Sequence, residues 1–207
     1  MSAIPGPGSA LFRSSLLLAA LAGCAPGQPT RYYTLSTVAE PAAAPRPGQR
    51  LVIGLGPLTL PQYLDRPDIV TRAGANQMRL GDFSQWAEPL EPLLARTMAE
   101  DLYALTGAGD VIPIPQRGDL PLDRVVEVDV ARFDADEAGE VKLDARWRVY
   151  RGDGETPVAS GRSQVAEQGA AVPDYDAIVA AMSRAVGQLS AEIATAIAEP
   201  LSPTRKR

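Results

Sequence analysis

Two segments of the chain alternate apolar and polar residues in the way that half-buried β-strands do. In 126–130, valine alternates with glutamate and aspartate, and in 141–149 apolar residues alternate with lysine, aspartate and arginine. One face of each strand is therefore apolar and the other is wet. The linking segment 134–139 is short and acidic. The pattern predicts an antiparallel pair with one face on a core and one in solvent.

A different period, of three and four residues, predicts two amphipathic helices. The first spans about 89–107, with Pro89 and Pro92 in its first turn, where missing amide hydrogens matter little, and Gly107 at its end. The second begins at Asp174, a good N-cap, and stops at Pro200.

The other apolar runs complete a sheet. Strands are predicted at 31–36, 51–56, 58–60 and 157–168, and a hairpin from 69–72 and 77–80 around 73–76. The order is strands, helix, strands, helix. It favours an α+β fold, a mainly antiparallel sheet with two amphipathic helices packed on one face. We expect one domain over residues 31–200, followed by a basic tail, 201–207.

The amino-terminal segment has the order of an export signal. Arg13 precedes the apolar run 16–22, which is too short to span a bilayer, and small residues lead to Cys24. This arrangement is a lipobox. It predicts a signal peptide at 1–23, cleavage between Gly23 and Cys24, and a lipid such as palmitate on the Cys24 thiol. Residues 24–30 would then form a lipidated tether of about 20 Å when extended.

Composition removes several classes of function. The 207 residues contain no histidine and one cysteine, so the usual general base, the commonest metal ligand and any His-paired nucleophile are missing. The net charge of −5 argues against a nucleic-acid partner. We expect a non-enzymatic protein with no cofactor beyond the covalent lipid on Cys24, and no metal site.

Two motifs that suggest binding chemistry fail on inspection. The run 54–56, Gly-Leu-Gly, follows a strand as a dinucleotide turn does, but Pro57 and another extended segment follow where a helix is needed. A bulge or close packing explains these glycines better.

The acidic segment 134–140 lacks calcium ligands at its fifth and twelfth positions, occupied by Ala138 and Ala145. A solvated hairpin tip is predicted.

One segment is not explained by core packing. The run 61–67, Pro-Gln-Tyr-Leu-Asp-Arg-Pro, places an aromatic, a leucine and an ion pair between prolines. Rigid loops of this kind often contact partners, although an ordinary packed turn has the same composition. Trp86 is similar, because it is either exposed for a partner or a hydrophobic staple before the helix. The partner-binding residues predicted from these segments are Tyr63, Leu64, Asp65, Arg66 and Trp86.

These residues resemble a known family. Cys24, the segments 32–35, 54–67, 69–72 and 86–90, Arg132-Phe133 and the strand bearing Trp147 are similar to the ABC-type transport auxiliary lipoproteins, the group with the paraquat-inducible membrane-integrity lipoprotein subunit. The Pro-x-Tyr-Leu-Asp-Arg-Pro run is the specific part.

The resemblance implies a non-enzymatic lipoprotein of the outer membrane, on its periplasmic face. Its partners would be a periplasm-spanning MCE-domain protein and an inner-membrane transporter component that move lipids or other hydrophobic molecules and maintain membrane integrity. Ala25 after the lipidated cysteine favours outer-membrane sorting. A homo-oligomeric ring would match the ring-shaped MCE assemblies. The alternative is a periplasmic lipid-binding carrier module, which would need an apolar cavity between helices and sheet.

Overall fold

The structure is a computed structural model that describes residues 28–40, 51–114 and 121–198. The predicted signal peptide, Cys24 and the basic tail lie outside the described residues. Within the described residues, no helix combines the length and the apolar character needed to cross a membrane.

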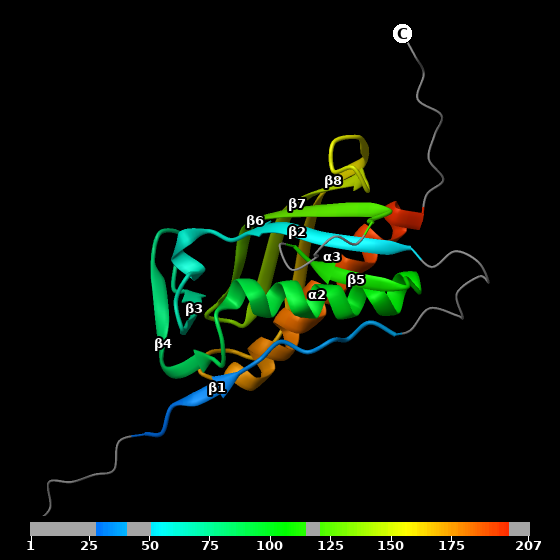
Figure 1. Ribbon diagram of the computed structural model, residues 1–207. Helices are drawn as coiled ribbons and strands as arrows, with labels where there is room; N and C mark the ends of the chain where they lie inside the picture. The colour runs from blue at the N-terminus through cyan, green and yellow to red at the C-terminus, as the bar shows by residue number, and fades with distance from the viewer. Residues whose placement is uncertain (1–27, 41–50, 115–120, 199–207) are drawn as a thin grey trace, which may run out of the picture.

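The sheet is built around its longest strand, β6 (Arg124–Asp136). One edge of β6 pairs antiparallel with β7 (Glu140–Arg151), which pairs antiparallel with β8 (Pro157–Gln168). These three long strands form the meander that the alternation predicts, and they carry most of the antiparallel pairing (Figure 1).

The other edge of β6 is shared by two groups of strands. Beside its first half lies β2 (Val52–Thr59), which pairs in turn with β5 (Asp110–Pro113), and both pairings are parallel. Beside its last residues lies β3 (Asp68–Arg72), followed by β4 (Met78–Trp86) and the short edge strand β1 (Arg31–Tyr33). The predicted hairpin is the antiparallel β3–β4 pair. The sheet is thus mixed and open.

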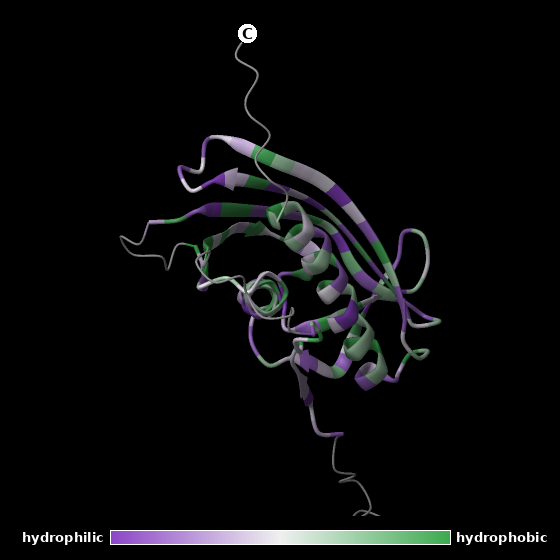
Figure 2. Ribbon diagram, turned by 90° about the vertical axis from the view of Figure 1, so that its right-hand side faces the viewer, coloured by the Kyte–Doolittle hydropathy of each residue, from purple (hydrophilic) through white to green (hydrophobic). Residues whose placement is uncertain are grey.

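Both helices lie on one face of this sheet, as predicted, and they also pack against each other (Figure 2). Helix α2 (Leu90–Thr106) ends at Gly107, whose positive φ of 61° suits a residue without Cβ. Helix α3 (Tyr175–Ala198) begins where the Asp174 carboxylate accepts a hydrogen bond from the Ala177 amide at 3.1 Å. The α+β fold class is confirmed.

A core of large side chains fills the space between helices and sheet. Leu94, Met98 and Leu102 of α2 and Ile178 and Leu189 of α3 are all completely buried. The helices therefore form a packed layer over the sheet.

Strand β2 is longer than expected. It passes through Pro57 without stopping, and its register on β6 shifts between Leu55 and Leu58. Gly56 has a φ of 135°, and a Cβ on Gly54 would lie 2.7 Å from Leu122 Cδ1. The glycines thus serve both a bulge and close packing, as predicted.

The prediction of a solvated acidic tip is wrong at its first residue. Strand β6 continues to Asp136, and its register shifts between Val130 and Arg132, which leaves Ala131 as an extra residue. The bulge reverses the alternation, so Phe133 now faces the core and Asp134 faces the other side. Asp134 is nevertheless fully buried, because other side chains cover it.

Candidate partner-binding site

The loop between β2 and β3 is compact. It contains η2 (Gln62–Leu64), a 3-10 turn in which the Leu64 amide donates to the Pro61 carbonyl at 2.9 Å. Leu64 points into the core with 3% exposure, whereas Asp65 and Arg66 are exposed at the tip. The loop therefore exposes one negative and one positive side chain, while Leu64 packs its inner side against the core.

A buried carboxylate holds this loop to the sheet. The Tyr63 hydroxyl donates to Asp134 Oδ2 at 2.9 Å. Arg72 donates to the same oxygen through Nη2 at 3.0 Å, and Arg132 donates to Oδ1 through Nη2 at 2.8 Å. Both oxygens of Asp134 are thus satisfied by donors from the loop, β3 and β6, so three segments are joined at one buried charge.

The contacts of this cluster shift the pKa values of Asp134 and Tyr63 in opposite directions. Burial raises the pKa of the Asp134 carboxyl, but hydrogen bonds from Arg72, Arg132 and Tyr63 outweigh burial and hold it below its ordinary value. Burial, and then the adjacent Asp134 charge, raise the pKa of Tyr63 to about 12. At neutral pH the cluster is therefore two guanidinium ions, one carboxylate and a neutral phenol.

Replacing Tyr63 with phenylalanine tests the anchor of the loop. Loss of the hydrogen bond to a charged acceptor is expected to lower the free energy of unfolding by about 1.5 kcal/mol. Because the folded protein raises the Tyr63 pKa from 10.0 to about 12, the native chain should also lose stability as the pH rises across this interval. Urea unfolding at pH 7 and at high pH measures both. A variant with unchanged stability at pH 7 would show that the hydroxyl does not hold the loop.

Trp86 fixes the carboxyl-terminal end of the loop, at Pro67. Its amide donates to the Pro67 carbonyl at 2.7 Å, and its side chain is 4% exposed within the same apolar core as Leu90. Trp86 therefore packs before α2 as a staple would. Leu64 and Trp86 support the site from inside, and the surface available to a partner comes from Tyr63, Asp65 and Arg66.

A cavity of about 300 Å³, here called the groove, lies beside the loop. The loop residues Gln62, Leu64 and Asp65 line one side, and Pro89 and Glu91 at the start of α2 line the other. The two predicted segments, 61–67 and 86–90, thus meet in space. The groove suits a polypeptide segment, because it combines a partly apolar floor with exposed charges.

Sequence reasoning missed the three residues that position this loop: Arg72, Arg132 and Asp134. From the sequence, Arg72 is placed only in a hairpin strand and the family resemblance, Asp134 only in an acidic tip, and Arg132 only in the family resemblance. The available signal was the break in the valine alternation after Val130, where an arginine and an aspartate replace the expected apolar positions.

Other acidic groups of the described residues lie outside this cluster. Among residues 28–40, 51–114 and 121–198, no three carboxylates lie close enough to hold a metal ion. Asp101 is buried, and burial raises its pKa, but its carboxylate accepts a hydrogen bond from the Ala39 amide at 3.3 Å. Its contacts give it a structural part, holding the segment after β1 against α2.

The described residues therefore define a small α+β domain with an exposed and internally braced loop. The family model for the ABC-type transport auxiliary lipoprotein component matches residues 33–194, and the chain belongs to this family.

Two solved structures share the fold. One is the crystal structure of an uncharacterized protein, with 19% identity, a TM-score of 0.66, and coverage of 83% of this chain and 100% of the other. The second is a protein from Xanthomonas campestris, with 21% identity, a TM-score of 0.63, and coverage of 81% and 95%. A search of curated proteins finds no match.

Proposed function

We propose that this chain is a lipid-anchored, non-enzymatic docking subunit of an MCE transport system that moves lipids or other hydrophobic molecules across the envelope. The observation that carries the proposal is the family match over residues 33–194, which contains the whole braced loop. The transport system supplies the energy and the path, and this subunit supplies an attachment point at the membrane.

The anchor is the lipid on Cys24. A diacylglyceryl group on the thiol and an acyl chain on the new amine after cleavage would provide more than one chain, and about 0.8 kcal/mol per buried methylene then makes attachment stable. Ala25 at the following position supports retention in the outer membrane. The lipid would hold the domain at the periplasmic face of the outer membrane.

The dock is the loop and its groove. Asp65 and Arg66 stand exposed on a backbone held by η2, by Tyr63 and by Trp86, so little conformational entropy is lost when a partner binds. The partner would be the end of the periplasm-spanning MCE-domain protein. A ring of this subunit would match the symmetry of a ring-shaped MCE assembly.

The Arg66→Ala variant tests the dock. Arg66 is exposed at the loop tip, so its removal should leave folding intact but weaken co-purification with the MCE-domain protein by about tenfold, the effect of losing an interface arginine. The matched control is Arg162→Ala on β8, whose guanidinium pairs with Asp144 at the outer face of the sheet. Equal recovery of the partner with both variants would show that the loop is not the dock.

The carrier alternative makes a different prediction. A module that carries lipid itself needs an apolar cavity between helices and sheet, yet this layer is filled by large buried side chains. Native mass spectrometry of the domain made without its anchor distinguishes the two. Bound lipid would support the carrier, and a mass of the polypeptide alone supports the dock.

A further inference from the structure

Large apolar side chains that remain exposed gather at one end of the domain. The described residues have five of them: Tyr32, Val38, Leu80, Phe83 and Tyr103. All except Tyr103 border one of two neighbouring cavities that share Tyr33 of β1. Phe83 is 44% exposed and Leu80 is 39% exposed, although buried core positions exist elsewhere on the same strand. Exposed apolar side chains that cluster in this way are typical of a surface that contacts a protein partner or a membrane.

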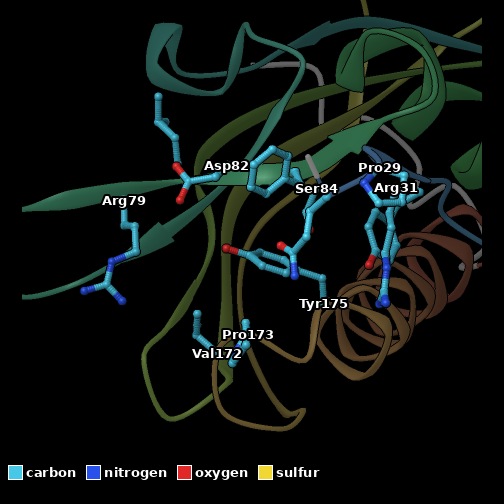
Figure 3. Close-up of a pocket in the computed structure, with 12 residues that line it drawn as sticks. Pro29, Arg31, Arg79, Asp82, Ser84, Val172, Pro173 and Tyr175 are labelled. Carbon is cyan, nitrogen blue, oxygen red and sulfur yellow. The ribbon is translucent and has the colours of Figure 1, made fainter. Parts of the chain in front are cut away.

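Leu80 and Phe83 border a cavity of about 440 Å³ beside the first described residues of the chain. Its lining includes Gln28 and Pro29, the first described residues, together with Leu80 and Phe83 of β4. Figure 3 shows the Tyr175 ring inside this cavity, with Pro29 and Arg31 on one side and Arg79 on the other.

The length of the tether limits how far this cavity can lie from a lipid on Cys24. Gln28 is four residues after Cys24, and an extended chain spans at most about 3.6 Å per residue, so the two Cα atoms are within about 14 Å. The headgroup layer of a bilayer is itself about 5–7 Å deep on each side. Gln28, which lines the cavity, therefore stays within about 14 Å of the lipidated residue whenever the anchor is inserted.

Two basic side chains and one acidic side chain, Asp82, line this cavity together with the apolar ones. Arg31 is paired with Asp176 only at 3.9 Å, and both side chains are about three-quarters exposed, so this pair contributes little. Arg79 is half exposed and pairs with Glu137 at 2.9 Å. Arginines beside a phenylalanine and a leucine match the boundary of a bilayer, where phosphates lie above acyl chains.

We propose that the surface formed by Leu80, Phe83, Arg31 and Arg79 is a membrane-contact face. Its occupant is the headgroup and upper acyl region of the membrane that holds the lipid of Cys24. The inference rests on the proposed anchor and adds an orientation to it: β1 and residues 79–83 of β4 face the bilayer. The domain is then held at two points, a covalent tether and a side-chain contact.

The membrane-contact face can be tested with a fluorophore attached to a new cysteine, because the chain contains one cysteine. Because Cys24 is the only cysteine and is acylated in the lipidated protein, a Phe83→Cys substitution adds the only free thiol. This thiol is labelled with a nitrobenzoxadiazole fluorophore, and the full lipidated protein is reconstituted into phosphatidylethanolamine and phosphatidylglycerol vesicles with and without a nitroxide lipid. The matched control is Tyr103→Cys on α2, an aromatic position of similar exposure, 55%, away from the cavity.

The expected result is a blue-shifted emission and strong nitroxide quenching for the label at position 83, with neither at position 103. Equal quenching at both positions, while both proteins still float with the vesicles, overturns the membrane-contact face and leaves the anchor intact. If neither protein floats with the vesicles, the anchor fails, and the membrane-contact face falls with it.

Discussion

Replacing Asp134 with alanine is expected to lower the free energy of unfolding by about 3–5 kcal/mol, the usual effect of removing one partner from a buried ion pair. The carboxylate is completely buried and accepts hydrogen bonds from Tyr63, Arg72 and Arg132. Without it, the two guanidinium groups, which are 24% and 29% exposed, face each other with no counter-charge. The loop at 61–67 would also lose the hydrogen bond from Tyr63 that ties it to β6.

The pH dependence of this effect has a definite sign. Because folding lowers the pKa of Asp134, its contribution is present above the carboxyl pKa of the unfolded chain, about 3.9, and is lost as the pH falls through the lower folded value. The Asp134→Asn variant should therefore be less stable than the native chain at pH 7. The difference should shrink in acid.

The control for Asp134 is the Asp144→Ala variant. Asp144 lies on the neighbouring strand and pairs with Arg162 at 2.9 Å, but that guanidinium is largely exposed, so its loss should change the free energy of unfolding by less than about 1 kcal/mol. Urea denaturation of the native chain and the three variants at pH 7 and at about pH 2.5, below the carboxyl pKa of the unfolded chain, gives the comparison. Similar losses for Asp134→Ala and Asp144→Ala would show that the cluster does not organise the fold.

The Cys24→Ser variant is expected to move the protein from the membrane to the soluble fraction. A serine hydroxyl offers no thiol for the diacylglyceryl group, so no acyl chain is attached at this position. Removing acyl chains, each contributing about 0.8 kcal/mol per buried methylene, leaves only side-chain contacts with the surface.

Fractionation and palmitate labelling measure this change together. The native chain should incorporate label and sediment with membranes, and the variant should do neither. The Arg66→Ala variant is the matched control, since it should remain labelled and membrane-bound. A serine variant that still sediments, or a native chain that takes up no palmitate, would remove the basis for an anchored subunit.

The elements with one-sided burial could be predicted from the sequence. The meander of β6, β7 and β8 and the two helices each place one face on the core, so their period of two or of about 3.6 appears directly in the order of residues. The caps at Asp174 and Gly107 were predictable for the same local reason. The exposed loop was visible because prolines bracket it.

The rest depends on contacts between distant segments. Parallel pairing of β2 with β5 and β6 joins residues about 60–70 positions apart, and no local pattern records it. The burial of Asp134 requires a bulge at Ala131 and donors from Tyr63 and Arg72, which belong to other elements. An aspartate beside an acidic turn therefore looks solvated until its partners are placed.

Site-specific photo-crosslinking in cells tests the docking role most directly. A photoreactive residue replaces Arg66 at the loop tip in the full lipidated chain, and Glu155 in the β7–β8 turn serves as the control. Arg151, which precedes this turn, pairs with Arg124 at the start of β6. Arg124 is ten residues from Asp134 on the same strand, a distance of about 33 Å along it. The account predicts an adduct with the MCE-domain protein, identified by mass spectrometry, from position 66 and none from position 155. An adduct from position 155 alone, or none from position 66 in cells that contain the partner, would contradict it.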